Sequence, residues 1–401
     1  MGKYDFETVL DRLGHDAVAL DYPCCERGFF PEGPKNGYSL IPMWVADMNF
    51  LTAPSVVESI QGRLDHHSFG YFSPRKEYYD AIMNWQKVRY GVDVTKEAIG
   101  YENGVMGALA TFLNTFMEEG EPLLIHGPTY IGFQDVIKTC GHPMSISPLV
   151  EDENGILRMD FEDMEKRIVD ENLKIAVFCS PHNPAGRVWE KWEVEKFMEL
   201  MKKYDLKVFS DEIWCDLILN GAPHIPTNSV SEDAKMRTVA AYAPSKTFSL
   251  SGMVASYHII YNEDLKKKMA ETAAKSHYNS MNIFSQYALI GAYNEEGQRW
   301  VDELLPVLAH NMEFVCDYIR TNYPSIKFHQ SQGTYMLYLD LGDFLAEKGI
   351  TIKDALRYGW ERGVMWQNGE PFGTPNSIRL NLALPTWQIE EAIKRLNTKL
   401  D

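Results

Sequence analysis

Lys246 is a lysine in an unusual place in the sequence, because it directly follows an apolar run. The run TVAAYA (238–243) precedes it, and small or apolar residues surround it in the segment PSKTF (244–248). Removal from water lowers the pKa of a lysine and exposes its neutral amine, which forms a Schiff base with an aldehyde. A lysine that reaches solvent along its aliphatic chain, or that binds a phosphate, is the ordinary alternative. This segment by itself leaves both interpretations open.

Asp211 and Asn183 stand at similar positions, after two other apolar runs. LKVFSD (206–211) ends in Asp211, and KIAVFCS (174–180) leads to Asn183 between two prolines. A buried carboxylate needs a cation or a hydrogen-bond donor, and a fixed carboxamide is able to donate to a phenolate oxygen. The alternatives are a helix cap or turn for Asp211 and a plain Asn-Pro turn for Asn183.

The segment NGVMGALA (103–110) opens an amphipathic stretch with small residues. The free backbone N–H groups at such a helix start are suited to a phosphate, although glycines there are also ordinary caps. The motifs GxGxxG, GxxxxGK[ST] and GxSxG are absent from the sequence. Their absence disfavours dinucleotide-binding, P-loop and serine-hydrolase chemistry.

Short apolar runs bounded by turns alternate with amphipathic stretches of helical spacing through the centre of the chain. We expect buried strands at 122–126, 174–180, 206–211, 238–243 and 254–261, and helices at 106–117, 130–140, 160–169 and 189–203. This alternation predicts an α/β fold whose central sheet is mostly parallel. Ligands of such sheets bind beyond the carboxyl ends of the strands, which is where Asn183, Asp211 and Lys246 are expected.

The two ends of the chain differ from this central part. A long helical pattern covers 294–323, and strands at 334–340 and 377–384 with a helix at 351–362 follow it. The first 45 residues contain prolines among glycines and are expected to be irregular. We therefore expect a large domain at 46–295 and a smaller α+β domain formed by 1–45 and 296–401.

The composition is that of an ordinary globular protein, with 45% hydrophobic, 12% aromatic and 24% charged residues in a chain of 401. Lys and Arg number 39 and Asp and Glu 56, which gives a net charge of -17. This charge repels phosphate backbones, so we do not expect a nucleic-acid partner. No apolar run approaches the roughly 18–20 residues of a membrane span, and the charged N-terminus is unlike a signal peptide. We expect a cytoplasmic protein with no membrane partner.

The cysteines and histidines give no sign of a disulfide framework or a metal site. The cysteines show neither CxxC spacing nor the density of a secreted scaffold, and the histidines lack HExxH spacing or a partner pair of cysteines. We expect buried or idle thiols and no metal. The six cysteines are Cys24, Cys25, Cys140, Cys179, Cys215 and Cys316.

Several of these segments together resemble one family. The Gly104 loop, Tyr130, Asn183, Asp211, Lys246 and Arg379, taken in this order, are similar to the sites of fold-type-I pyridoxal-phosphate enzymes. Five longer segments resemble the MalY and PatB type of cystathionine β-lyase, within the class I/II aminotransferase superfamily. These segments are MWVADM (43–48), HNPAGRVW (182–189), SDEI (210–213), SKTF (245–248) and RLN (379–381). The resemblance covers nearly the whole chain and implies the fold-type-I architecture, with a large cofactor-binding domain and a smaller one.

The resemblance implies a role for each residue around the cofactor ring. Lys246 would hold pyridoxal 5'-phosphate covalently and later move the Cα proton of the substrate. Asp211 would face the pyridine nitrogen and keep it protonated, so that the ring accepts electrons. Asn183 would donate to the ring hydroxyl oxygen and contact the substrate. Tyr130 would stack on the ring face, with an ordinary core tyrosine as the alternative.

The resemblance also implies how the phosphate and the substrate are held. The backbone amides of Val105 and Met106 and the hydroxyl of Ser245 would bind the phosphate. Tyr71 would reach it from a second subunit, which implies a homodimer with shared active sites. Arg379 would grip the α-carboxylate of an amino-acid substrate, and a surface salt bridge is the alternative for this residue.

Three positions depart from the family pattern. Trp214 stands where the family commonly has His, and Asn49 stands where it commonly has Asp. Both changes alter the expected substrate pocket. Ala243 stands where many wider relatives carry a phosphate-binding serine, which places more of the phosphate binding on Ser245 and the Gly104 loop.

The resemblance favours an enzyme that eliminates a thiol from Cβ of cystathionine, cysteine or a related sulfur amino acid and leaves pyruvate and ammonia. An aminotransferase of an α-amino acid is the alternative, since both reactions share a carbanion at Cα, and racemisation is a third outcome. A protein kept for binding a ligand or partner, with little turnover, belongs to a different class. The presence of Lys246, Asp211 and Arg379 argues against that class.

Overall fold

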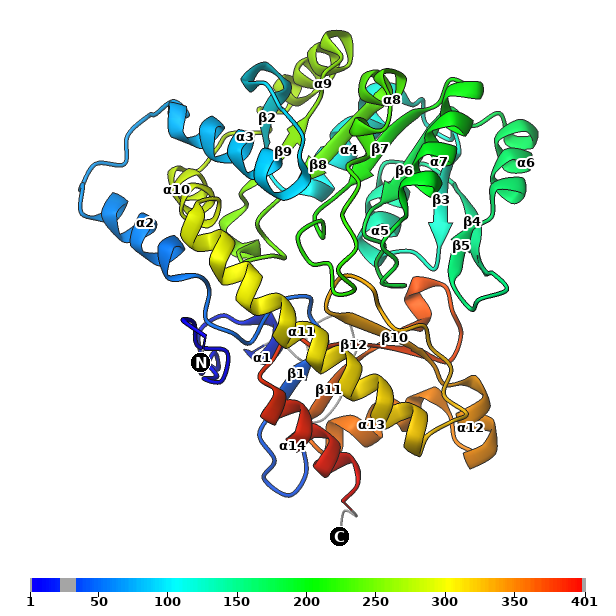
Figure 1. The fold of residues 1–401 in the computed structure, drawn as a ribbon. Coiled ribbons are helices and arrows are strands. Elements are labelled where there is room, and N and C mark those ends of the chain that lie inside the picture. The colour runs from blue at the N-terminus through cyan, green and yellow to red at the C-terminus, as the bar shows by residue number, and fades with distance from the viewer. Residues whose placement is uncertain (1, 22–33, 399–401) are drawn as a thin grey trace. The chain divides into compact units, whose positions relative to one another are not determined.

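The larger unit of the protein is built on an eight-stranded sheet with the strand order β2-β9-β8-β7-β6-β3-β4-β5 in the computed structural model (Figure 1). The strands from β8 through β7, β6 and β3 to β4 are parallel to one another, whereas β9 and β5 are antiparallel to their neighbours. Their bounds are β2 (Ile99–Glu102), β3 (Leu123–Gly127), β4 (Met144–Glu151), β5 (Leu157–Met159), β6 (Ile175–Cys179), β7 (Lys207–Asp211), β8 (Thr238–Tyr242) and β9 (Ser256–Ile259).

Helices flank this sheet and connect most of its strands. They are α2 (Pro54–Leu64), α3 (Lys76–Tyr90), α4 (Val105–Phe116), α5 (Ile131–Thr139), α6 (Phe161–Glu171), α7 (Lys191–Lys203), α8 (Glu232–Arg237), α9 (Glu263–Lys275) and α10 (Ile283–Ala292). Crossover helices of this kind are what joins neighbouring parallel strands.

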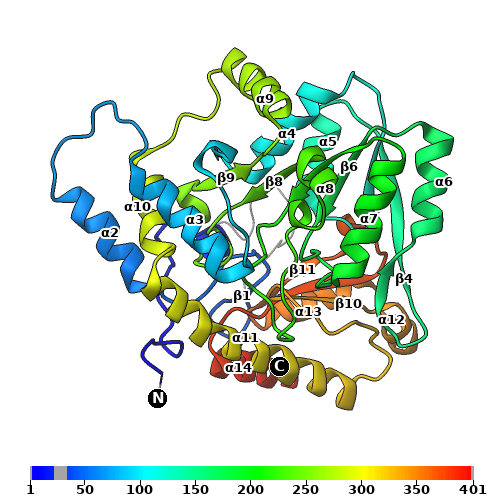
Figure 2. The same ribbon diagram turned by 45° about the horizontal axis from the view of Figure 1, so that its top comes forward.

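Alternate residues of the central strands pack on opposite faces of the sheet. In β6, Ile175 and Val177 belong to an apolar cluster with α4, α5 and α9, whereas Ala176 and Phe178 belong to a cluster with α6, α7 and α8. Because successive side chains of a strand point to opposite faces, helices cover the sheet on both sides (Figure 2). This double burial explains why the parallel strands are nearly continuous apolar runs.

The smaller unit is built on a four-stranded sheet with the order β1-β11-β12-β10. β1 is parallel to β11, whereas β12 is antiparallel to both β11 and β10. The elements are α1 (Val18–Asp21), β1 (Ile41–Met43), β10 (Met336–Asp340), α12 (Gly342–Lys348), α13 (Ile352–Glu361), β11 (Val364–Asn368), β12 (Ser377–Asn381) and α14 (Thr386–Leu396). The long helix α11 (Glu295–Asn322) begins in the larger unit and ends in the smaller one.

The structure describes residues 2–21 and 34–398. Their contacts group Met1–Leu51, Pro184–Gly186 and Glu303–Asp401 into the smaller unit, and Thr52–Asn183 and Arg187–Asp302 into the larger one. The division into functional domains at 46–295 and at 1–45 with 296–401 stays a prediction.

The expected α/β fold with a mostly parallel sheet is confirmed, and each strand and helix expected in the centre of the chain is present. The expectation for the N-terminal region is incomplete, because β1 lies within it and pairs with β11. The short strands β1 and β5 span three residues each, too few to show an alternating pattern. The strand β11, with which β1 pairs, was also not predicted from the sequence.

Two further expectations concern the membrane and the thiols. Within the described residues, no helix combines the length and the apolar composition that crossing a membrane requires. Cys140, Cys179, Cys215 and Cys316 are free thiols, and all but Cys140 are buried. The expectation for Cys24 and Cys25 concerns residues outside the described ranges.

Candidate active site

Four of the residues singled out in the sequence follow four consecutive strands of the larger sheet. Lys246 follows β8, Asp211 ends β7, Asn183 follows β6, and Tyr130 follows β3. These strands are neighbours in that order and run parallel. Because parallel strands end at one edge of a sheet, the fold brings all four residues to the same edge, where ligands of open α/β sheets bind.

Asp211 is a buried carboxyl group with little hydrogen bonding of its own. Its side chain is 4% exposed, and Oδ1 accepts a hydrogen bond from the amide of Ile213 at 3.0 Å. Burial raises the pKa of Asp211 to about 7, although the Ile213 amide and the positive charge of Lys246 act in the opposite direction. The carboxylate therefore lacks a strong partner and is suited to a protonated ring nitrogen.

Glu212, the next residue, is buried in a very different environment. Its carboxylate accepts hydrogen bonds from His224 (2.7 Å), Tyr242 (2.7 Å), Ser210 (2.9 Å) and the amide of Thr227 (3.0 Å). Burial would raise the pKa of Glu212, but the hydrogen bonds from these donors outweigh it and hold the pKa below its usual range. The two adjacent carboxylates therefore differ in role. Glu212 stabilises the end of β7 through its hydrogen bonds, whereas Asp211 is suited to binding a ring nitrogen.

Lys246 lies in a tightly packed turn after β8. Its neighbours Ser245 and Thr247 are buried, and the amide of Phe248 donates to the carbonyl of Pro244 at 2.9 Å. The ammonium Nζ of Lys246 lies 5.6 Å from the ring centroid of Trp214. The unusual tryptophan of the sequence is therefore a direct neighbour of the lysine.

Asp216 joins this turn to helix α3, a connection that the sequence reading missed. Its Oδ2 accepts a hydrogen bond from Thr247 Oγ1 at 2.9 Å, while Oδ1 accepts from Tyr90 Oη at 2.5 Å and Trp85 Nε1 at 3.1 Å. Asp216 is 2% exposed. The acid among apolar neighbours in IWCDL (213–217) was a signal for a buried role, but its partners on α3 lie too far away in the sequence to be read.

The start of α4 offers backbone donors. Gly104 is the N-cap residue with φ 90° and ψ 148°, and no side chain caps the helix. A positive φ of this size favours glycine, and without a capping side chain the amides of Val105 and Met106 are suited to a phosphate. A Cβ atom on Gly107 would overlap the hydroxyl of Tyr278, which donates to the carbonyl of Asn103 at 2.8 Å.

Tyr130 and Tyr71 differ in their surroundings. The ring of Tyr130, at the start of α5, meets Phe133 edge-to-face with centroids 5.5 Å apart. Gly132 leaves room for it, because a Cβ atom there would overlap the ring. Tyr71, between α2 and α3, is fully exposed and makes no hydrogen bond to the described part of the chain. The fold of one subunit therefore does not bring Tyr71 into the group at the sheet edge.

Arg379 belongs to the smaller unit, where it stands in the middle of β12. It is 3% exposed, and its Nη2 donates to Gln367 Oε1 at 2.5 Å and to the carbonyl of Trp44 at 3.4 Å. The guanidinium carbon lies 4.6 Å from the ring centroid of Phe372. Arg379 is therefore a buried residue of the sheet and not part of the protein surface.

The segment that contains Asn49 is held against β12. Asn381 Nδ2 donates to the carbonyls of Val45 and Asp47, both at 2.6 Å. Arg12 donates to Asn49 Oδ1 at 2.5 Å and to Asp47 Oδ2 at 3.0 Å. Asn49 is 5% exposed, so this departure from the family pattern is accommodated by a hydrogen bond from a cation.

The donor set of the larger unit fits a phosphorylated aldehyde with a basic ring nitrogen. Lys246 supplies an amine, and the start of α4 supplies uncapped amides for the phosphate. Asp211 supplies a buried carboxylate whose pKa burial raises despite the positive charge of Lys246. Ser245 is buried next to Lys246. Within residues 2–21 and 34–398, no three His, Cys, Asp or Glu side chains come together in a way that would hold a metal ion.

Comparison with known proteins shows similarity to pyridoxal-phosphate enzymes along nearly the whole chain. The family model described as aminotransferase class I and II matches residues 40–396. The chain is similar to cystathionine beta-lyase PatB of Bacillus subtilis, with 31% identity over 99% of this chain and 100% of that protein. Its fold is similar to that of cystalysin from Treponema denticola, which contains pyridoxal 5'-phosphate, with a TM-score of 0.90, 31% identity and 98% of each chain covered. The PLP-bound C-S lyase from Staphylococcus hominis gives a TM-score of 0.87 and 30% identity, again over 98% of each chain.

Proposed function

The chain belongs to the aminotransferase class I and II family, and from this membership we propose that it is a pyridoxal 5'-phosphate-dependent C-S β-lyase. It eliminates a thiol from Cβ of cystathionine, cysteine or a related sulfur amino acid and leaves pyruvate and ammonia. The observation that carries the proposal is the placement of Asp211 and Lys246 after neighbouring parallel strands, in a chain similar over its full length to a cystathionine β-lyase. We place the enzyme in the cytoplasm.

Lys246 and Asp211 carry the chemistry at Cα. Pyridoxal phosphate, when bound, supplies a ring that accepts the electron pair left at Cα. Lys246 would hold the aldehyde group through its amine, and the same amine would take the proton from Cα of the substrate. Asp211 would be ionised opposite the protonated ring nitrogen, because that positive charge would lower the pKa that burial raises in the cofactor-free site. The sulfur leaves with the electron pair of the Cβ–S bond, and one water converts the remaining three-carbon fragment into pyruvate and ammonia.

The remaining residues of the larger unit hold the cofactor in place. Asn183 donates to the ring hydroxyl oxygen and contacts the substrate, and Tyr130 stacks on the ring. The amides of Val105 and Met106 and the hydroxyl of Ser245 bind the phosphate, since the start of α4 has no side-chain cap. Several donors on one phosphate fix the cofactor more firmly than the covalent bond alone.

Arg379 binds the substrate α-carboxylate through its planar guanidinium. Its burial in β12, its contact with Phe372 and its hydrogen bond to Gln367 hold the side chain in one orientation. An ordered guanidinium loses little conformational entropy when the carboxylate arrives.

Tyr71 donates to the cofactor phosphate of a second subunit in a homodimer with shared sites. Its complete exposure within its own chain supports this role. Mixed dimers of Tyr71→Phe and Lys246→Ala subunits test the proposal, provided that each parent is impaired. One hybrid site then carries both defects and the other carries neither, so activity recovers. If the hybrids are no more active than the two parents, Tyr71 acts within its own subunit.

Turnover without an acceptor tests the reaction type. Purified enzyme loaded with cofactor is given a β-thio amino acid and no keto acid, and pyruvate and thiol are followed over time. A lyase releases both products over many cycles. An aminotransferase, the alternative, stops after one equivalent per site and resumes only when a keto acid is added. That second result would replace the lyase proposal.

A further inference from the structure

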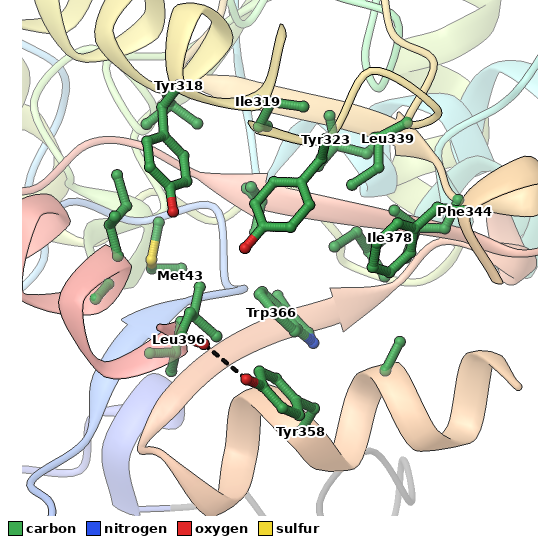
Figure 3. Close-up of a pocket in the computed structure, with 18 of the residues that line it drawn as sticks. Met43, Tyr318, Ile319, Tyr323, Leu339, Phe344, Tyr358, Trp366, Ile378 and Leu396 are labelled. Atoms are coloured by element: carbon green, nitrogen blue, oxygen red, sulfur yellow. Dashed lines mark hydrogen bonds between the residues drawn. The ribbon is translucent and has the colours of Figure 1, made fainter. Parts of the chain in front are cut away.

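The smaller unit contains an apolar pocket of about 580 Å³, which falls within the usual range of about 300–1,000 Å³ for small-molecule sites. Tyr318 and Ile319 of α11, Trp366 of β11, Ile378 of β12, Tyr358 of α13 and Leu396 of α14 are among the side chains that line it (Figure 3). Five secondary-structure elements thus contribute these side chains to its wall. The cavity is a pocket with depth and not one exposed face of a helix.

The pocket has a buried floor and an exposed rim. Leu339 of β10 and Ile389 of α14 are 3% and 1% exposed, whereas Ile350 and Tyr358 are 39% and 44% exposed. Covering apolar surface at such a rim with a ligand is favourable, because it removes that surface from water. The pocket is therefore open to solvent beside Ile350 and Tyr358.

The pocket lies on the opposite face of β12 from Arg379. Ile378 and Leu380 line the pocket, and successive side chains of a strand point to opposite faces. Arg379 lies between them in the sequence and donates to Gln367 and Trp44 instead. The pocket is consequently not part of the site assigned to the substrate carboxylate.

Among the described residues that line the pocket, one is charged, and it is a cation. Lys348 ends α12, and its Nζ lies 5.9 Å from the ring centroid of Phe344, which also lines the pocket. Within the described residues no carboxylate pairs with Lys348, although the chain carries 56 acidic residues against 39 basic ones. An unpaired lysine above an apolar interior complements an anion with an apolar body.

The polar groups of the tyrosines are turned to one end of the pocket. Tyr358 Oη donates to the carbonyl of Leu396 at 2.7 Å, and Tyr318 Oη accepts from Asn397 Nδ2 at 2.7 Å. Figure 3 shows the first of these bonds, and it shows the ring of Tyr318 from α11 and the ring of Tyr323, which directly follows α11, on one side of the pocket. Burial raises the pKa of Tyr323 to about 12, so its hydroxyl adds no negative charge that would oppose an anion.

We propose that this pocket binds one small apolar monocarboxylate, such as a medium-chain fatty acid. Its hydrocarbon body lies between α11, the sheet and α13, and its carboxylate lies at Lys348. The proposal rests on the smaller unit alone and stands or falls independently of the reaction that the larger unit catalyses.

Isothermal titration calorimetry of the cofactor-loaded, full-length protein with sodium octanoate tests the proposal. We expect one saturable site per chain with a dissociation constant on the order of 0.1–1 mM, as a short alkyl chain with a single charge permits. Ile393→Trp places an indole in the pocket from α14 and abolishes binding, whereas Lys394→Trp at the next position, which does not line the pocket, leaves it unchanged. Equal binding by these two variants would overturn the proposal.

A second pair of variants tests the carboxylate, and a further variant guards against misfolding. Lys348→Gln weakens octanoate binding about threefold to fivefold, the range of an exposed ion pair, and leaves binding of neutral 1-octanol unchanged. Lys353→Gln, an exposed lysine of α13 outside the pocket, changes neither. Equal losses for octanoate and octanol in Lys348→Gln would contradict the assignment of the carboxylate. If thermal unfolding shows that Ile393→Trp is not folded, Ile350→Trp at the exposed rim blocks the same entrance, and undiminished binding there overturns the proposal.

Discussion

The edge of the large sheet and the centre of the small sheet place functional groups in different ways. In the larger unit, Asp211 and Lys246 follow neighbouring parallel strands, so the topology alone brings them to one edge. In the smaller unit, Arg379 stands inside the antiparallel strand β12, and its partners come from Trp44 and Gln367. The ends of parallel strands therefore bring together polar residues that can be recognised in the sequence one after another. The neighbours of a residue inside a strand, in contrast, are known only from the fold.

Replacement of the two adjacent carboxylates gives the sharpest contrast at the sheet edge. Asp211→Asn removes the anion that we propose faces the ring nitrogen. We therefore expect kcat to fall about 10³-fold, the upper range for the loss of one electrostatic contact in a transition state, with little change in thermal stability. Glu212→Gln breaks a buried network and destabilises the fold by about 3 kcal/mol. Steady-state kinetics and thermal unfolding of both variants check this, and interchanged effects would contradict the division of tasks.

Asp211 also makes the cofactor-free protein sensitive to pH. The pKa of Asp211 is about 7 in the folded chain, against about 3.9 for an aspartate in an unfolded chain, so the folded state binds the proton more tightly. The protonated Asp211 carboxyl thus adds about 2–4 kcal/mol to the free energy of unfolding. This contribution is fully present below about pH 4 and is lost as the pH rises through about 7. Urea unfolding of the cofactor-free wild type and of Asp211→Asn at several pH values measures the contribution of Asp211 to this pH dependence. A difference between the two proteins that is constant with pH would show that Asp211 is not buried as a neutral acid.

Arg379→Ala tests whether a residue inside the small sheet acts on the substrate. We expect KM to rise about 10–100-fold for every α-amino acid tested, since hydrogen bonds to a charged group contribute about 1.5–3 kcal/mol. Arg357→Ala, at an exposed position of α13, serves as the matched control and leaves KM unchanged. A rise confined to one substrate would mean that Arg379 contacts a side chain and not the shared carboxylate.

Thr247 and Asp216 give the smallest expected effect, because they act on Lys246 only through the turn. Thr247→Val removes the 2.9 Å hydrogen bond to Asp216. We expect kcat to fall about fivefold, because only part of the about 1.5–3 kcal/mol of a hydrogen bond to a charged group acts on Lys246 through the turn. The pH midpoint of the bound cofactor's visible absorbance shifts as well, which a purely structural role would not cause. Thr247→Ser keeps the hydroxyl and restores both readouts. Failure of the serine variant to restore them would remove the hydrogen bond from the account.

The strand ends were predictable because each residue ends or directly follows an apolar run. Asn183, Asp211 and Lys246 were found in this way, and the helix start at Val105 was found from its small residues. The roles of Tyr71 and Arg379 came only from the family resemblance, because one is an exposed tyrosine and the other an arginine within a strand. Nothing in the sequence around these two residues indicates a catalytic or binding role by itself.

The rest depended on contacts between distant parts of the chain. Asp216 meets Trp85 across 131 residues of sequence, and no local pattern links them. The apolar pocket is lined by residues from Met43 to Leu396, and most of them are apolar residues that no sequence pattern distinguishes from the rest of the core. Trp214 was recognised as a departure from the family, but its place beside Lys246 became clear only from the fold.

Borohydride reduction of the cofactor-loaded enzyme, followed by peptide mapping, tests most directly that the edge of the large sheet holds the cofactor. The purified protein should be yellow, and reduction should fix one cofactor per chain on Lys246. Lys246→Ala should fold normally and carry no adduct, whereas Lys202→Ala, an exposed lysine of α7, should carry it as the wild type does. An adduct on another lysine, or none after reconstitution, would contradict the assignment of the active site to the ends of β7 and β8.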